Sequence, residues 1–384
     1  MRIIYLDHNA TSPVRPEVAE AAQPYLAATF GNPNSIHRFG REAREAVENA
    51  RQEAAELIGA ADAEEIIFTS GGTESDNWAL RGVVSAAGGT GHIVTSAIEH
   101  PAVLDTCKSL EKTGVEVTYI SPDRKGRVSA GDVAGAIRPD TRLVSVMWAN
   151  NEVGTIQPIE EIAALCRERQ VPFHTDAVQA VGKVPIDVEA AGISLLSATG
   201  HKFNGWKGAG FLYVRKGVAL DPLITGGGQE QNLRSGTENV SGIVALGEAC
   251  RLAREESPAA ARDLAALRDQ LENEICERIP DVVVNGDPGH RLPGTANLGF
   301  LGAEGETLLI RLDLEGIAVS TGSACSSGST EPSHVLLAMG LPDGAVKGSL
   351  RFSLGWGNTE EDIKRLVEVL PEAVERVRAL APSR

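Results

Sequence analysis

Short apolar segments alternate with helical patterns through the first part of the chain, up to about residue 214. Strands that are separated by helices form βαβ crossovers, which require a mostly parallel sheet with helices on both faces. The expected strands are 65–69, 92–96, 116–120, 142–148, 172–175, 193–196 and 210–214, and the expected helices are 16–26, 41–58, one from Thr73 onward, 102–113, 129–137 and 159–170. Ligands bind such sheets at the carboxyl ends of the strands, so the residues after each strand are the candidates for a site.

The pattern changes after Gly242. Two long helical stretches come first, and short strands and further helices then follow in mixed order. The expected helices are 243–254, 259–279, 306–314 and 360–380, and the expected strands are 282–284, 295–298, 317–320 and 350–354. This order predicts a smaller α+β domain behind the larger α/β domain.

Composition excludes several classes of protein. The 384 residues carry a formal net charge of -16 and show no basic stripe, so we expect no direct nucleic-acid binding. The five cysteines are far apart and lack metal-site spacing, which argues against a disulfide framework or a zinc site and for a reducing compartment. No long apolar run and no signal-peptide pattern are present, so we expect a soluble cytoplasmic protein without a membrane span.

One lysine follows a predicted buried strand. Residues 197–205 place Lys202 among small residues directly after the apolar run 193–196. Partial desolvation would lower the pKa of such an amine and make it available for Schiff-base chemistry. The local sequence alone favours a solvated loop lysine, because lysine is mostly exposed.

Other strand ends carry polar residues with two possible uses each. Residues 70–73 could bind a phosphate at a helix N-terminus or form a simple turn, and Thr73 is expected to open the next helix as a capping box. His100 could be a base or a stacking ring, or a solvated loop histidine. Asn150 and Asn151 could bind a ligand or only make a turn. Asp176 needs a partner at its buried strand end, either a protonated heterocycle nitrogen or a helix cap.

Cys325 differs from the other cysteines. Its neighbours are small, polar or glycine, which predicts an accessible thiol on a flexible loop that can act as a nucleophile. The other four lie within helical patterns, where thiols behave as small hydrophobes: Cys107, Cys166, Cys250 and Cys276.

Together these residues give the chain a close resemblance to the cysteine desulfurases of the NifS/IscS type. These enzymes belong to the class V aminotransferase family and have fold type I. They use pyridoxal 5'-phosphate (PLP) as their cofactor. The resemblance covers almost the whole chain through the motifs YLDHNAT, GNPNSIHRFG, SGGTESDN, NNEVGTIQP, GGGQEQNLRSGTENV, GSACSSGSTEPSHVL and RFSLG. It implies a large PLP-binding domain over 15–250 and a small domain made of 1–14 and 251–384. The small domain would carry a mobile cysteine loop at about 321–333.

The resemblance also implies the cofactor site. Lys202 would hold PLP as a Schiff base, Asp176 would pair with the pyridinium nitrogen, and His100 would stack on the ring and move protons. Gln179 and Asn151 would lie near the 3-oxygen of the ring. The phosphate would be bound by Gly72, Thr73, Thr199 and His201, and by Thr237 of the other subunit of a homodimer.

The implied reaction converts L-cysteine to L-alanine. Arg351 would bind the substrate carboxylate together with Asn151, and Lys202 would remove the Cα proton. Cys325 would take the sulfur as a persulfide and pass it to an acceptor protein, either an iron–sulfur scaffold or a tRNA-thiolation enzyme. No resident metal is implied, although Cys325 could briefly contact an iron–sulfur cluster.

Two alternatives stay open on the sequence. The chain could be a selenocysteine lyase or another class V PLP enzyme, or a sulfur carrier on a degenerate fold, although such a carrier would be expected to lack Lys202 or Asp176. The chain also departs from the family pattern after Phe203, where the family commonly has Tyr or His followed by Gly-Pro-Lys-Gly. Here Asn204 replaces the Tyr or His, and Trp206 replaces the proline.

Overall fold

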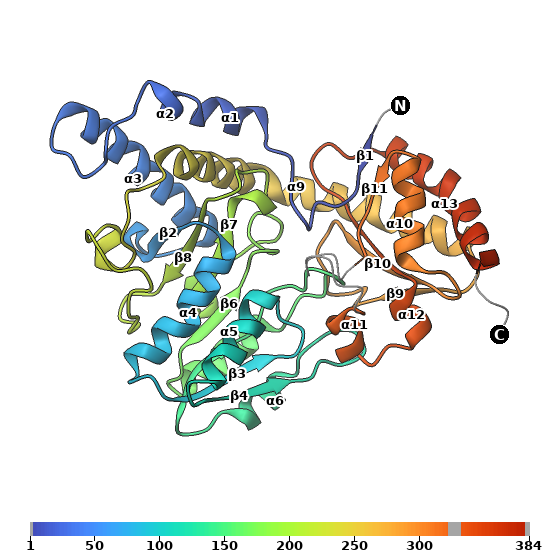
Figure 1. Ribbon diagram of the computed structural model, residues 1–384, viewed down its shortest axis with the longest axis horizontal. Coiled ribbons are helices and arrows are strands. Elements are labelled where there is room, and N and C mark those ends of the chain that lie inside the picture. Colours follow the sequence, from blue (N-terminus) through green and yellow to red (C-terminus); the bar gives the residue numbers. More distant parts are fainter. Residues whose placement is uncertain (1–2, 322–331, 381–384) are drawn as a thin grey trace.

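A seven-stranded sheet forms the centre of the protein in a computed structural model that describes residues 3–321 and 332–380 (Figure 1). The strand order is β2-β8-β7-β6-β5-β3-β4. The strands are β2 Ile66–Thr69, β3 Gly91–Ser96, β4 Val115–Ile120, β5 Thr141–Ser145, β6 Phe173–Asp176, β7 Leu195–Thr199 and β8 Gly210–Val214. All neighbours pair in parallel except β8, which runs antiparallel to both β2 and β7. The expected mostly parallel sheet is confirmed.

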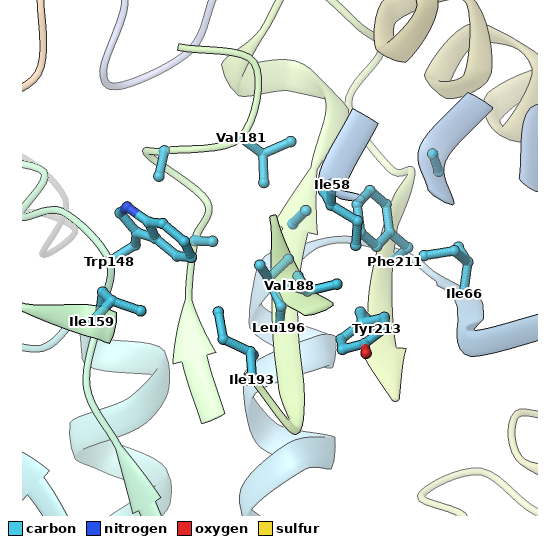
Figure 2. Packing of buried hydrophobic residues seen from close by; sticks show 14 of the residues in the cluster. Ile58, Ile66, Trp148, Ile159, Val181, Val188, Ile193, Leu196, Phe211 and Tyr213 are labelled. Carbon is cyan, nitrogen blue, oxygen red and sulfur yellow. The ribbon is translucent and has the colours of Figure 1, made fainter. Parts of the chain in front are cut away.

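Helices cover this sheet on both faces. The helices in this part of the chain are α1 Pro16–Ala22, α2 Pro24–Ala27, α3 Arg38–Ile58, α4 Gly72–Ala86, α5 Pro101–Glu111, α6 Ala130–Ala136, α7 Ile159–Glu168 and α8 Val188–Ala191, with short 3-10 helices η1 Ala63–Glu65, η2 Gly200–Lys202 and η3 Glu230–Asn232. Successive residues of one strand are buried in different hydrophobic cores. Ile66 lies in the first core, and Ile67 lies in another core on the opposite face of the sheet. Figure 2 shows the first core, where Phe211 lies between Ile58 and Ile66 in this view. Alternation of this kind is the mark of a sheet that is buried on both faces.

A second group of elements lies at the other end of the molecule (Figure 1). Its members are β1 Ile4–Tyr5, β9 Val282–Asn285, β10 Thr295–Phe300, β11 Ile317–Ala318, β12 Ser349–Ser353, α10 Gly305–Leu314, α11 His334–Ala338, α12 Asp343–Lys347 and α13 Glu360–Leu380. The antiparallel sheet β12-β10-β9 and the parallel pair β1-β11 pack with α10 and α13 around a core of their own. The N-terminal strand therefore belongs with the C-terminal part of the chain. The exact division into two domains stays a prediction.

One long helix joins the two cores. The helix α9 runs from Val240 to Arg278, where the sequence predicted two helices with a break near Pro258. A proline removes one backbone hydrogen bond and usually bends or ends a helix. Leu246 is buried in the first core and Leu271 in the second, so tertiary packing holds the helix on both sides of the proline. No helix among the described residues is long and apolar enough to span a membrane.

A buried ion pair holds a segment of unusual backbone beside the sheet. Arg51 on α3 donates from Nη1 and Nη2 to the two carboxylate oxygens of Glu230, at 2.8 Å each. Glu230 also accepts a hydrogen bond from the backbone N–H of Phe68 at 2.9 Å. Three residues in succession, Glu230, Gln231 and Asn232, have positive φ angles of 45°, 60° and 66°. Non-glycine residues in this region carry strain, and the ion pair offsets it.

Replacing Arg51 with methionine should therefore be strongly destabilising. The change leaves the Glu230 carboxylate, 8% exposed, without its cation, which costs about 3–5 kcal/mol. Thermal and urea unfolding measure the effect. Arg138 offers a matched control, because its side chain is 37% exposed and its ion pairs lie at the surface. An Arg138→Met variant should lose far less stability than Arg51→Met, and equal losses in the two variants would contradict the prediction.

Candidate active site

Lys202 lies at the end of β7, in the short helix η2, and its amine is held by the N-terminal segment. Its Nζ donates to the backbone oxygens of Asn9 at 2.7 Å and Ala10 at 2.8 Å. The side chain is half-buried. The solvated loop lysine that the local sequence favoured is therefore wrong, and the amine is fixed in place.

Asp176 ends the neighbouring strand β6, which pairs in parallel with β7. Its carboxylate is buried, and Oδ1 accepts from the backbone N–H of Val178 at 3.0 Å. Burial raises the pKa of Asp176, while the charges of His100 and Lys202 lower it. A buried carboxylate of this kind is stabilised by a cationic partner such as a protonated ring nitrogen. The parallel pairing thus brings Asp176 and Lys202 to the same edge of the sheet.

A layer of buried polar groups lies behind Asp176. His174, fully buried, contacts the hydroxyl of Ser145 through Nδ1 at 2.8 Å and that of Ser197 through Nε2 at 3.0 Å. Burial lowers the pKa of His174 to about 3, so this ring is neutral. Asp76 on α4 lies 3.7 Å from His174 Nε2, and burial together with the charge of Asp176 raises the pKa of Asp76 well above its usual value. The layer thus adds little net charge next to Asp176.

Glu99 is a second buried carboxyl group close to the site. Its Oε1 accepts from the hydroxyl of Ser96 at 2.5 Å and from the backbone N–H of Met147 at 2.9 Å. Among the described residues its Oε2 is buried without a hydrogen-bond partner. Burial raises the pKa of Glu99 to about 8, with a further contribution from the charge of Asp176. Glu99 is therefore largely protonated at neutral pH.

His100 is the N-cap of α5 and not a solvated loop residue. Its Nδ1 accepts from the backbone N–H of Ala102 at 3.1 Å, so the proton of the neutral ring resides on Nε2. Burial lowers the pKa of His100, so the neutral form is favoured. The cap fixes the ring at the sheet edge that also carries Asp176.

The N-terminus of α4 differs from the predicted capping box. The N-cap residue is Gly71, which has φ 150° and no capping side chain, and Thr73 lies within the first turn with an exposed side chain. Glu74 instead accepts from the backbone N–H of Ser70 at 2.9 Å. A Cβ atom at Gly72 would lie only 2.6 Å from Val178 Cγ2, so the backbone approaches the β6 loop closely here. A helix N-terminus without a capping side chain suits a phosphate.

Two further residues named from the sequence lie at the end of β7 and in the short helix η2 that follows it. Thr199 is buried at the end of β7, and its hydroxyl donates to the backbone oxygen of Ala209 at 3.2 Å. His201 contacts the hydroxyl of Thr11 through Nδ1 at 3.1 Å. Burial, together with the charge of Lys202, lowers the pKa of His201 to about 4, so a neutral ring faces Thr11.

A network around Asn9 joins residues that the sequence predicted to others that it missed. Gln179 donates from Nε2 to the backbone oxygen of Asn9 at 2.9 Å, and its Oε1 accepts from Lys183 Nζ at 2.7 Å. The side chain of Asn9 donates to the backbone oxygen of Asn151 at 3.2 Å. Asn150, by contrast, makes the turn, because its Oδ1 accepts from the backbone of Glu152 at 2.9 Å. Asn9 and Lys183 are the additions that the structure makes to the predicted site.

Arg351 is fully buried on β12, close to this network. Its Nη2 donates to Asp7 Oδ1 at 2.7 Å and its Nη1 to the backbone oxygen of Asn151 at 3.0 Å. Among the described residues its Nε is buried without a hydrogen-bond partner. A buried guanidinium with an unsatisfied donor is suited to bind one more oxygen, such as that of a carboxylate.

Two predicted residues are not brought into this group. Thr237 has an exposed side chain within the single chain. Cys325 lies outside the described residues. Residues close to both ends of the segment 322–331 nevertheless contact site residues. Ser320 pairs through its backbone with Arg351, and His334 Nε2 contacts the backbone oxygen of Glu99 at 3.0 Å.

Of the other cysteines, Cys107, Cys166 and Cys250 are buried as predicted. Cys276 is exposed, because its position on α9 faces away from both cores, and the prediction that it packs as a small hydrophobe is wrong.

The unusual segment after Phe203 now has a physical explanation. Asn204 has a positive φ of 68°, a conformation that asparagine tolerates better than most residues. Its side chain donates to the backbone oxygen of Pro13 at 2.9 Å, and its backbone N–H donates to Ser12 Oγ at 2.7 Å. Trp206 packs on the edge of the first core. Asn204 therefore helps to hold the N-terminal segment against Lys202.

Comparison with known proteins matches residues 4–366 to the family model described as Aminotransferase class-V. A Cysteine desulfurase IscS from Methanosarcina thermophila is 53% identical over 382 residues, covering 99% of this chain and 94% of that protein. A Cysteine desulfurase IscS from Dictyoglomus turgidum is 51% identical, covering 99% and 97%. Among solved structures, a NifS-like protein superposes with a TM-score of 0.92 at 38% identity and covers 98% of this chain and 100% of its own. The structure named SspA in complex with cysteine gives 0.80 at 38% identity, covering 91% and 98%.

Glu99 makes stability depend on pH in a specific direction. Its pKa of about 8 in the folded protein exceeds the ordinary value of 4.5. The unfolded chain therefore releases this proton at a lower pH than the folded protein does. The wild type loses stability as the pH rises from about 4.5 to about 8. A Glu99→Gln variant has no such proton. Its melting temperature relative to the wild type should therefore increase between pH values of about 4.5 and about 8. Thermal melts over a pH series measure this, with the exposed Glu20→Gln as the control. A constant offset at every pH would refute the assignment.

Proposed function

Because the chain belongs to the class V aminotransferase family, we propose that its site performs the reaction named for its relatives, as a PLP-dependent cysteine desulfurase. The substrate is L-cysteine, the product is L-alanine, and the sulfur passes to Cys325. The observation that carries this proposal is the placement of Lys202 and Asp176 on adjacent parallel strands, beside a helix N-terminus that has no capping side chain. An amine, a buried carboxylate and a phosphate-binding turn match the three polar ends of PLP.

The residues at this edge fit the cofactor. The backbone at Gly72 and the side chains of Thr73, Thr199 and His201 would bind the phosphate at this turn. Asp176 would pair with the ring nitrogen, because burial leaves its carboxylate in need of a cation. Lys202 would hold the cofactor covalently, and His100, fixed by its cap, would stack on the ring. When bound, PLP supplies an electron sink that weakens the bonds at the substrate Cα and Cβ.

The substrate would bind on the other side of Lys202. Arg351 is buried and has an unsatisfied Nε, and a carboxylate of L-cysteine would complete its hydrogen bonds. Asn151, whose backbone oxygen already accepts from Arg351, would orient the same group. Lys202 would then take the proton from the substrate Cα. The backbone oxygens of Asn9 and Ala10 hold its amine in place for this step.

Sulfur transfer would fall to Cys325. Its thiolate attacks the sulfur of L-cysteine, the Cβ–S bond breaks and an S–S bond forms, so that Cys325 carries a persulfide. Cβ gains the proton that completes L-alanine, and no outside oxidant or reductant is needed. The described residues next to 322–331 support this role, because Ser320 pairs with Arg351 and Ser333 binds Glu152 Oε2 at 2.5 Å. Both flanks of the cysteine segment thus lie beside the substrate site.

The partners follow from the same chemistry. The persulfide would pass to an acceptor protein of iron–sulfur cluster assembly or of tRNA thiolation, in the cytoplasm. The exposed Thr237 would complete the phosphate site of a second copy in a homodimer. A selenocysteine lyase is the second candidate, since the same carboxylate site would accept selenocysteine, and parallel assays with the two amino acids separate the two functions.

The direct test is incubation of the PLP-loaded protein with L-cysteine. We expect stoichiometric L-alanine and an added sulfur atom on the Cys325 peptide, both measured by mass spectrometry. Alanine without a persulfide on Cys325 would assign the chain to the lyases. The absence of both products would overturn the proposal.

A Cys325→Ser variant should form no persulfide, and its rate of alanine release with a thiol acceptor should fall by roughly a hundredfold or more, because the hydroxyl is a far weaker nucleophile toward sulfur. Cys276→Ser is the matched control, since that thiol is exposed on α9 and should be dispensable. Full activity of the Cys325→Ser variant would show that another group takes the sulfur.

Lys202 should be the only covalent attachment point of the cofactor. Borohydride reduction of the PLP-loaded wild type should add the cofactor mass to the Lys202 peptide, and a Lys202→Ala variant should show no such adduct. The exposed Lys216→Ala variant controls for nonspecific labelling. A reducible adduct on any other lysine of the Lys202→Ala protein would contradict the assignment.

A further inference from the structure

A second lysine, Lys183, lies within the same network and has no part in the reaction described above. It ends the turn after β6, four residues beyond Gln179. Its Nζ donates to Gln179 Oε1 at 2.7 Å and to Asn9 Oδ1 at 3.2 Å. Asn9 thus accepts from both lysines, from Lys183 on its side chain and from Lys202 on its backbone oxygen.

The contacts of Gln179 fix which way its amide faces. An ammonium group has only donors, so the amide oxygen must face Lys183. The backbone oxygen of Asn9 is an acceptor, so the amide nitrogen must face Asn9, as its Nε2 does at 2.9 Å. With its oxygen occupied, Gln179 can offer only N–H groups to anything bound beside Lys202.

We propose that Lys183 is a positioning residue that holds Gln179 as a hydrogen-bond donor toward the cofactor. The inference rests on the proposed function and on the expectation, from the family resemblance, that Gln179 lies near the 3-oxygen of PLP. That oxygen carries negative charge and needs a donor. Without Lys183 only the contact with Asn9 would hold the amide, and a turned amide would present its oxygen to the ring oxygen, which would repel it.

The charges around Lys183 are compatible with this role. The cationic groups that act on it are Lys202 after β7 and Arg351 on β12, and it acts in turn on His8 and His201. Burial, with these two charges, lowers the pKa of Lys183 to about 7. Below that pH the ammonium group cannot accept a hydrogen bond at all, and the neutral amine above it still has two N–H groups for its two acceptors. The Asp7 carboxylate close by is already bound to Arg351.

The test compares Lys183→Met with Lys183→Arg by PLP titration of the apoprotein and by the visible absorption band of bound PLP. The methionine side chain has a similar length but no donor, so PLP affinity should fall roughly fivefold to tenfold, the effect of one hydrogen bond, and the band should shift. Arginine has only donors and should keep the wild-type band. The exposed Lys112→Met variant is the control.

The decisive comparison introduces Lys183→Met into a protein that already carries Gln179→Leu. If Lys183 acts through Gln179, Lys183→Met should change neither the affinity nor the band further in a Gln179→Leu protein. Three results would each overturn the inference. Lys183→Met could change the affinity and the band equally in the Gln179→Leu protein, or it could match the wild type in both readouts. A folded Lys183→Arg variant could also give the same affinity and band as Lys183→Met. These readouts need no turnover. If Lys183→Met and Gln179→Leu show the expected non-additive effects on PLP binding but the protein forms no alanine, only the proposed function is refuted. If the protein forms alanine but the two substitutions act independently, only the role of Lys183 is refuted.

Discussion

The hydrogen bonds from Lys202 to the backbone oxygens of Asn9 and Ala10 connect the two halves of the molecule. Lys202 belongs to the large sheet, whereas the N-terminal segment is anchored in the smaller group of elements through the pairing of β1 with β11. Asn9 extends this connection, since its backbone N–H donates to Ser353 Oγ at 3.0 Å and its side chain to Thr295 Oγ1 at 3.0 Å. The amine is therefore held by residues that the other core fixes in place.

The electrostatics of the site follow from burial more than from ion pairing. Asp176, Asp76 and Glu99 are all buried carboxyl groups, and burial is the largest cause of the raised pKa of each. Three ionised carboxylates so close together would destabilise the fold, so some of them retain protons. A cationic ring nitrogen beside Asp176 would stabilise the ionised form of that residue first. The arrangement thus favours one specific charged ligand at one specific strand end.

Sequence reasoning predicted the sheet, most of the helices and the strand-end residues, because hydrophobic periodicity and the position after a strand determine them directly. Asp176 and Lys202 are of this kind. It could not predict Asn9 or Lys183, since Asn9 meets Lys202 across 193 residues and Lys183 lies well beyond the end of β6. The break expected at Pro258 failed because the packing of α9 on two cores outweighs a local preference. The antiparallel direction of β8 depends on a connection from β7 that carries no crossover helix.

The pairing of β1 with β11 also imposes an order of assembly. Ile4 lies opposite Ile317, Asp7 binds Arg351, and Asn358 donates to the backbone oxygen of Tyr5 at 3.0 Å. The N-terminal segment can take up its position only after these C-terminal residues have folded. Until then Asn9 and Ala10 have no fixed position, and the large sheet, already complete by residue 214, holds a lysine without its acceptors. The acceptors of the Lys202 amine are therefore in place only once both ends of the chain have folded together.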